Sequence, residues 1–213
     1  MMIRPCQPSD EAAIRQICFD TALFGNSMRG FIDDIELITE SIIGYHIRYE
    51  PESLLVAEDQ GLVAGYLSGC RDTRRFERIY ARKILPRVLL RFFSQGHWRK
   101  RNAWRLVLFG MRSAPQWKAL HQTVSADYPA HLHCNVKPGM QGRGIGAALM
   151  DAFIGGLTAR RVSGVHLTTA TDAGKAFFAR CGFQTLARRS MPSLAGYPPQ
   201  EVWLMVRKCA PAP

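Results

Sequence analysis

Apolar and polar positions along the chain predict strands and helices in alternation. In the first third, apolar residues recur at helical spacing and then form two short runs separated by Asp59-Gln60-Gly61, which is typical of a β-hairpin. The elements predicted in this part are, in chain order, an edge strand at 3–8, helices at about 9–25 and 32–49, and strands at 53–58 and 62–70.

Residues 71 to about 126 interrupt this pattern. Large apolar residues recur there at near-helical spacing, with a break predicted at Pro86 and a helix end at Gly96. Further helical turns carrying three tryptophans follow. We interpret this segment as a helical insertion between the third and fourth strands.

The remainder of the chain returns to alternating strands and helices. The elements predicted there are a strand at 131–136, a helix at 143–161, a strand at 165–170, a helix at 173–180 and closing strands at about 185–190 and 202–207. With 213 residues, 47% of them hydrophobic, the chain is long enough for one sizeable core. We therefore expect residues 1–213 to form a single domain.

The net charge of +11 is concentrated in the insertion. Residues 71–112 contain 13 Lys and Arg against 2 Asp and Glu, whereas the other residues contain 15 of each sign. Such a segment could steer an acidic substrate or partner, contact nucleic acid, or be the solvated face of helices docked on the core. We favour a docked cap or a lid over the substrate, and do not favour nucleic acid, because the aromatic residues fall at packing spacing and no nucleic-acid-binding motif accompanies them.

Several features narrow the class of protein. No apolar stretch approaches the roughly 20 residues of a membrane-spanning helix, and the first eight residues lack the apolar region of a signal peptide. The six cysteines are scattered without CxxC pairs, which is typical of reduced cysteines and not of a zinc site. We expect a cytoplasmic protein without a membrane span, and the oligomeric state stays open.

A glycine-rich loop joins the strand at 131–136 to the following helix. Gly142, Gly144 and Gly146 lie at this junction, where unpaired N–H groups and the partial positive charge of a helix N-terminus favour a phosphate or pyrophosphate. A Walker loop is excluded because Ala147 and Ala148 stand where Lys and Ser or Thr would be required. The glycine spacing also differs from that of a Rossmann turn.

The full pattern from Val136 to Gly146, Val-x-Pro-x-x-Gln-x-x-Gly-x-Gly, resembles the acetyl-CoA-binding motif of the GNAT superfamily of N-acetyltransferases. The order of predicted elements is similar to that family's architecture over almost the whole chain. The resemblance implies an α/β (α+β) fold with a mixed, mostly antiparallel twisted sheet flanked by helices, interrupted by the insertion at about 71–126, with the cofactor-binding core at about 130–183. It also implies direct transfer of acetyl from acetyl-CoA to a primary amine of a small molecule or protein.

The resemblance further implies which residues bind the cofactor. Backbone N–H groups of the loop bind the pyrophosphate, Arg143 is available for a phosphate, and the pantetheine arm pairs with the strand at Asn135 and Val136. The N–H of Val136 is then the donor to the thioester oxygen as negative charge develops on it. The full set implied is Asn135, Val136, Gln141, Gly142, Arg143, Gly144, Ile145, Gly146, Thr171, Gly174, Phe177 and Phe178.

An amine nucleophile is mostly protonated at neutral pH, so a base must receive its proton. His131, His133 and Asn135 alternate along one strand and should share a face. We predict that His133 is the base, because histidine titrates in the useful range, and that Asn135 and Val136 complete the catalytic set. An equally open reading is that the histidines are satisfied sheet residues. Metal binding is not favoured, since no third ligand stands at a suggestive spacing.

One position departs from the family's pattern. Residues 171–183 resemble the family's last helix and the Gly-Phe after it, but Phe178 stands where many members have the tyrosine that protonates the leaving thiolate, and Thr171 replaces an asparagine. Tyr197 or water could supply the proton, or no dedicated acid is required. The alternatives are a catalytically weak acetyl-CoA-binding module or an interaction protein acting on an acidic partner.

Two further expectations concern kinship and the acceptor. Residues 128–133 resemble bacterial acetyltransferases related to the C-terminal domain of eukaryotic O-GlcNAc hydrolases. We expect the acceptor pocket to be formed by residues 24–35, the insertion and residues 191–199, but the sequence does not identify the acceptor amine.

Overall fold

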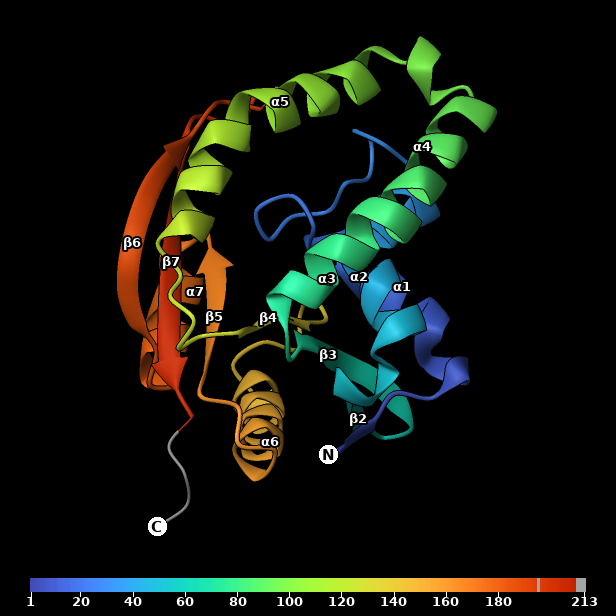
Figure 1. Cartoon of the computed structure of the whole chain (residues 1–213). Helices are drawn as coiled ribbons and strands as arrows, with labels where there is room; N and C mark the ends of the chain where they lie inside the picture. The colour runs from blue at the N-terminus through green and yellow to red at the C-terminus, as the bar shows by residue number, and fades with distance from the viewer. Residues whose placement is uncertain (195, 210–213) are drawn as a thin grey trace.

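The computed structural model describes residues 1–194 and 196–209, built on a seven-stranded sheet in the order β1-β2-β3-β4-β5-β7-β6 (Figure 1). All neighbouring strands are antiparallel except β4 and β5, which run parallel. This confirms the expected mixed, mostly antiparallel sheet. The strands are β1 Met2–Pro5, β2 Leu54–Asp59, β3 Leu62–Cys70, β4 Ala130–Val136, β5 Gly164–Thr169, β6 Gln184–Met191 and β7 Gln200–Lys208.

Residue 195 of the predicted acceptor loop 191–199 and residues 210–213 of the predicted domain lie outside the described residues. The helices that flank the sheet are α1 Glu11–Thr21, α2 Ile35–Tyr49, α3 Thr73–Ile79, α4 Leu85–Ser94, α5 Arg101–Gln122, α6 Ile145–Ala159 and α7 Asp172–Arg180.

The two faces of the sheet are covered by different helices because side chains alternate along each strand. On one face, Ile14 and Ile17 of α1 pack with Val56 and Tyr66 of β2 and β3. On the other face, α6 packs its apolar stripe against β2, β3 and β4, and α7 joins the same cluster through Phe178. The second cluster forms the larger core and also includes residues of β5 and β7.

The insertion is helical, as predicted, but the break expected at Pro86 is wrong. A π-helical turn, Tyr80–Ile84, continues α3 into α4, and its wider hydrogen bond runs from the Leu85 N–H to the Tyr80 carbonyl. The π-helical turn accommodates Pro86, which follows it in the first turn of α4 and has no N–H to donate. The helix end predicted at Gly96 is confirmed, since Gly96 has the left-handed φ of 68° that favours glycine.

Helices α4 and α5, with the turn between them, form an arch over residues 85–122 (Figure 1). Helix α4 and the turn after it pack on α2, where Phe92 belongs to the same apolar cluster as Leu37 and Ile38. The C-terminal part of α5 packs on β6 and β7, where Leu120 belongs to one cluster with Met191 and Leu204. Helix α5 curves between these two contacts, and Pro115 inside the helix explains the bend.

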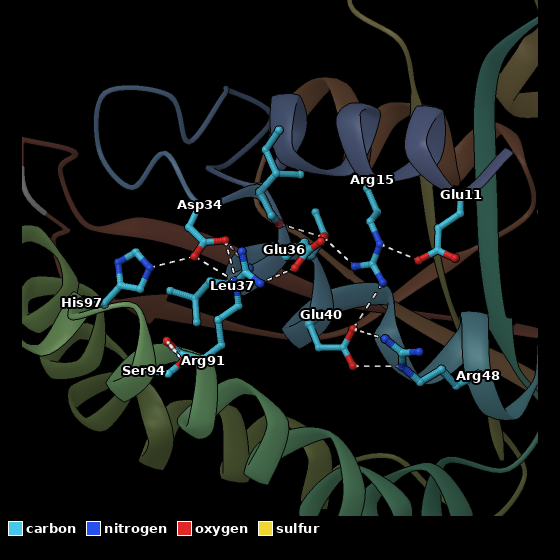
Figure 2. A network of polar contacts seen from close by, with 12 residues as sticks. Glu11, Arg15, Asp34, Glu36, Leu37, Glu40, Arg48, Arg91, Ser94 and His97 are labelled. Carbon is cyan, nitrogen blue, oxygen red and sulfur yellow. Dashed lines mark hydrogen bonds and ion pairs between the residues drawn. The ribbon is translucent and has the colours of Figure 1, made fainter. Parts of the chain in front are cut away.

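A polar network attaches the arch to α2 (Figure 2). Asp34 caps α2 by accepting the Leu37 N–H at 2.9 Å. The same carboxylate accepts the Nε–H of Arg91 at 2.9 Å and contacts Nε2 of the buried His97 at 2.8 Å. Since Arg91 lies on α4 and His97 in the turn after it, one carboxylate fixes both to the start of α2.

Candidate active site

Strands β4 and β5 pair only at their first residues, Ala130 with Val165 and His131 with His166. Beyond that point they diverge, and a cleft of about 900 Å³ opens between them. The cleft is lined by β4 from Leu132 to Val136, by the end of β5, by the glycine loop and by the start of α6 and α7. The divergence of β4 and β5 therefore leaves space for a ligand within the sheet.

The open edge of β4 presents unpaired backbone groups to this cleft. Lys137 donates its N–H to the Ala64 carbonyl of β3 at 2.9 Å. Because successive residues of a strand point their backbone groups to opposite edges, the N–H and carbonyl of Val136 point away from β3, into the gap. The Val136 carbonyl accepts from Nε2 of Gln141 at 3.5 Å, which agrees with this orientation.

The loop before α6 is shaped by glycines with left-handed backbone. Gly139, Gly142 and Gly144 have φ of 84°, 79° and 80°, which other residues rarely adopt. Gly144 is the N-cap of α6, and no side chain caps the helix there. The first-turn N–H groups and the helix dipole thus face the cleft without a side-chain acceptor, which fits a diphosphate.

Gly146, the third glycine of the motif, is needed for helix packing, whereas the sequence suggested that it lets an anion approach the backbone. A Cβ at Gly146 would lie 2.9 Å from Cζ of Phe177, so glycine is required for the close approach of α6 and α7. At Gly174 a Cβ would lie 2.3 Å from Oγ1 of Thr169. Both glycines therefore hold α7 close to its neighbours, and α7 borders the cleft.

The cleft brings together the predicted cofactor-binding residues, with one exception. All of them line it except Arg143, whose exposed side chain is not part of the lining. Thr171 lines the cleft, but its Oγ1 accepts the Gly174 N–H at 3.0 Å and caps α7. Phe24 and Trp117 also line the cleft. The sequence placed both in regions expected near the acceptor, yet no local signal distinguished them from ordinary packing residues.

The predicted shared face of β4 is confirmed by the strand register. His131, His133 and Asn135 lie opposite Cys70, Ser68 and Tyr66 of β3, respectively. Leu132, Cys134 and Val136 belong instead to the core cluster under α6. Nδ2 of Asn135 donates to Oη of Tyr66 at 2.9 Å, which fixes this amide at the edge of the cleft.

His133 differs from the histidines around it. His46 is fully buried and its Nδ1 bonds the Gly69 carbonyl at 2.9 Å; burial lowers the pKa of His46 to about 4. His131 is buried and its Nδ1 bonds Oγ1 of Thr73 at 2.8 Å, so these two rings are structural, neutral groups. His133 lines the cleft, and within the described part of the chain its ring has no hydrogen-bond partner.

His133 is exposed in the cleft, and desolvation by the protein around it lowers its pKa below the usual histidine value. Its ring centroid lies 6.5 Å from that of His46, whose Nε2 is buried and unpartnered among the described residues. The Oγ of Ser68, which lies opposite His133 on β3, is likewise buried and has no hydrogen-bond partner among the described residues. The buried His46 Nε2 and Ser68 Oγ do not line the cleft but lie in the protein near His133, and the described residues leave their hydrogen-bonding capacity unused.

The position of Phe178 is settled by packing. It is 8% exposed, and its ring lies 5.0 Å from Phe177 and 5.9 Å from Phe183, between centroids. Tyr197, the alternative acid, packs on Phe24 at 6.0 Å and is not among the residues that line the cleft. Neither residue 178 nor Tyr197 therefore places a tyrosine hydroxyl in the cleft.

No group of three or more His, Cys, Asp or Glu side chains in the described ranges is arranged to hold a metal ion. Among the helices of the described part, none has the length and apolar character needed to cross a membrane.

Comparison with known proteins agrees with this geometry. Residues 116–185 match the acetyltransferase (GNAT) domain family. The crystal structure of SsHAT is 30% identical, with a TM-score of 0.72 over 98% of each chain. The ribosomal-protein-alanine N-acetyltransferase of Brucella melitensis is 18% identical, with a TM-score of 0.58 over 98% of this chain and 99% of that one.

A third solved structure is yncA of Salmonella typhimurium, a putative acetyltransferase determined with its cofactor acetyl-CoA. It is 17% identical, with a TM-score of 0.59 over 100% of this chain and 96% of that one. The match to SsHAT extends over nearly all of both chains, and the family match covers the glycine loop and its two flanking strands. The chain therefore belongs to the GNAT superfamily of acetyltransferases.

Proposed function

We propose that the protein transfers the acetyl group of acetyl-CoA to a primary amine by direct attack. The observation that carries the proposal is the meeting, in one cleft, of an uncapped helix N-terminus, the open edge of β4 and the imidazole of His133. The presence of acetyl-CoA in the structure of yncA supports the same cofactor here.

Each part of the cleft has a role in this proposal. The backbone N–H groups of residues 141–146 bind the diphosphate, and Gln141 braces their loop by accepting the Gly139 N–H at 2.8 Å. Arg143 is exposed beside the loop, where it is available to a phosphate. The pantetheine arm lies along the open edge of β4 and pairs with the backbone of Val136.

The start of α7 forms the opposite wall of the cofactor site. Thr171 and Gly174 shape the first turn of α7, and the rings of Phe177 and Phe178 supply apolar surface beside Ile145 of α6. We assign these residues to cofactor binding through packing and backbone, because the Thr171 hydroxyl is already used as a helix cap.

The thioester supplies an acetyl group that is activated toward attack by an amine. His133 receives the proton of the attacking amine, and its lowered pKa keeps the ring neutral and able to accept at pH 7. The Val136 N–H points into the cleft and donates to the carbonyl oxygen as charge develops there. Asn135 positions the end of β4 through its bond to Tyr66. Water entering the cleft protonates the thiolate, since Phe178 has no proton to donate.

Release of free CoA from acetyl-CoA, followed with a thiol reagent over a panel of primary amines, tests the proposal. We expect at least one amine to raise CoA release well above hydrolysis, and we expect His133→Gln to abolish the increase while acetyl-CoA still binds. If acetyl-CoA binds and no amine raises the rate, the enzyme assignment is contradicted and a binding module is supported.

A further inference from the structure

The outer face of the arch carries large apolar side chains that nothing in the described structure covers. Leu90, Met111 and Phe93 are 71%, 68% and 57% exposed. We call this surface the outer arch face; its apolar members are Leu85, Leu89, Leu90, Phe93, Trp98, Trp104, Leu108 and Met111.

The spacing shows that these residues form continuous stripes. On α4, Leu85, Leu89 and Phe93 recur every fourth residue, beside the buried Phe92. On α5, Trp104, Leu108 and Met111 recur at i, i+4 and i+7, on the side of the helix away from the buried Ser113 and Leu120. Both helices therefore have an inner face that packs on the protein and a second, outer apolar stripe.

The two stripes meet at the apex of the arch, which Figure 1 shows at the upper right, away from the sheet. Nε1 of Trp104 donates to the Trp98 carbonyl at 2.6 Å. The rings of Phe92 and Trp104 lie 6.0 Å apart, and those of Phe92 and Phe93 lie 5.4 Å apart. Because Asp34 holds the apex on α2 (Figure 2), the surface is fixed in orientation.

The charge on this surface is of one sign. Residues 78–126 contain 11 Lys and Arg and no Asp or Glu. Of the 13 basic residues in 71–112, those that pair with a carboxylate in the described part of the chain are Arg71 and Arg91. On α5, Arg101, Arg105 and Arg112 form a row beside the apolar stripe.

A small hollow adjoins the stripe. It measures about 450 Å³ and is lined by Arg105, Arg112, Leu108 and Ser193, among others. Two guanidinium groups and a hydroxyl around an open hollow fit a phosphate, and Leu108 lies on its rim. An apolar stripe with arginines beside it is the arrangement of an interfacial helix.

We propose that the outer arch face docks the protein on an anionic lipid bilayer, with the apolar stripes in the headgroup region and the arginines on lipid phosphates. A second copy of the chain is disfavoured as the occupant, because two unpaired cationic faces would repel each other. Nucleic acid is disfavoured because most of the exposed apolar residues are leucine and methionine, which do not stack on bases. The proposal does not depend on acetyl transfer.

Co-sedimentation with phosphatidylcholine vesicles, with and without phosphatidylglycerol, tests this. We expect binding to the anionic vesicles and a blue shift of tryptophan fluorescence that is lost in Trp98→Phe/Trp104→Phe. Leu108→Ser/Met111→Ser should weaken binding about tenfold or more. Arg105→Gln/Arg112→Gln should also weaken it about tenfold or more, since each cation near the surface contributes about fivefold.

Matched controls separate the surface from the composition of the chain. Leu62→Ser/Leu186→Ser removes two similarly exposed leucines, and Arg160→Gln/Lys208→Gln removes the same charge, both outside residues 85–122. Neither should weaken binding by more than about twofold to threefold.

Three results would overturn the proposal: equal loss in the controls, stronger binding of duplex DNA or RNA that ignores Leu108 and Met111, or a vesicle-independent dimer that Leu108→Ser/Met111→Ser dissociates. A fourth such result is the absence of binding to the anionic vesicles.

Discussion

Gly146 of α6 lies against the ring of Phe177 of α7, so closely that a Cβ on Gly146 would stand 2.9 Å from the ring's Cζ. This contact brings the N-termini of two helices to the same cleft. The glycine motif therefore has two physical functions, since Gly142 and Gly144 permit left-handed backbone, whereas Gly146 permits helix–helix contact.

Gly146→Ala should lower the free energy of unfolding by about 1–3 kcal/mol, because the added methyl forces Phe177 out of its position. Gly155→Ala is the matched control: it lies in the same helix, and a Cβ there meets nothing within 4 Å. Helix propensity favours alanine equally in both, so the difference between them measures the contact. Phe177→Leu should recover part of the loss in the Gly146→Ala background, and urea unfolding gives both values. Equal stability of the two alanine variants would show that the contact is not tight.

His133→Gln should lower kcat/KM by about 100-fold or more, with the affinity for acetyl-CoA unchanged. In the wild-type protein the rate should rise with pH as His133 loses its proton. Because desolvation lowers the pKa of His133, this rise should lie below the ordinary value of about 6.5. The variant should lack that rise, and His121→Gln, on the exposed surface of α5, should keep it. An unchanged pH–rate profile in His133→Gln would remove His133 from the role of base.

Asp34→Asn should destabilise the protein by about 1–3 kcal/mol at pH 7, because asparagine still caps α2 but no longer compensates Arg91. Burial alone would raise the pKa of Asp34, but hydrogen bonds from the Leu37 N–H, His97 and Arg91 lower it overall. A carboxyl with a lowered folded pKa stabilises the fold above its unfolded pKa of about 3.9, and this contribution is lost as the pH falls through the folded value. The difference between wild type and variant, measured by urea unfolding, should therefore shrink as the pH falls from about 3.9 toward the lowered pKa of folded Asp34. A constant difference from pH 7 to that point would mean that the charge of Asp34 contributes nothing.

Phe178→Tyr restores a hydroxyl at the position where many relatives have a tyrosine. Phe178 is enclosed by Phe177 and Phe183, so the hydroxyl should cost about 1 kcal/mol of stability. We expect kcat to change by less than about threefold, because water protonates the thiolate in the mechanism that we propose. A kcat raised tenfold or more would show that protonation of the thiolate limits the natural protein.

The parts of the fold that the sequence predicted well depend on local pattern. Strand β3 runs over Leu62–Cys70 as predicted, because a turn signal and an apolar run define both its ends. The glycine loop was predictable because a phosphate-binding turn needs glycine at fixed spacing. Both depend on interactions within about ten residues of chain.

The features that were missed depend on contacts between distant residues. Pro86 predicts a break, but a π-helical turn adjusts the hydrogen bonding before it. Thr171 lines the cleft as a predicted cofactor-binding residue, but the hydrogen bond by which its hydroxyl caps α7 was not predicted. Trp117 reaches the cleft only because α5 spans from α2 to β6, which no local pattern indicates. The roles of His133, Asn135 and Val136 stay predictions.

The most direct test of the central claim is a crystal structure with acetyl-CoA. We predict the diphosphate within hydrogen-bonding distance of the backbone N–H groups of residues 141–146, with the thioester between β4 and β5 and its oxygen bonded to the Val136 N–H. Acetyl-CoA bound elsewhere, or the cleft filled by side chains at saturating acetyl-CoA, would contradict the account.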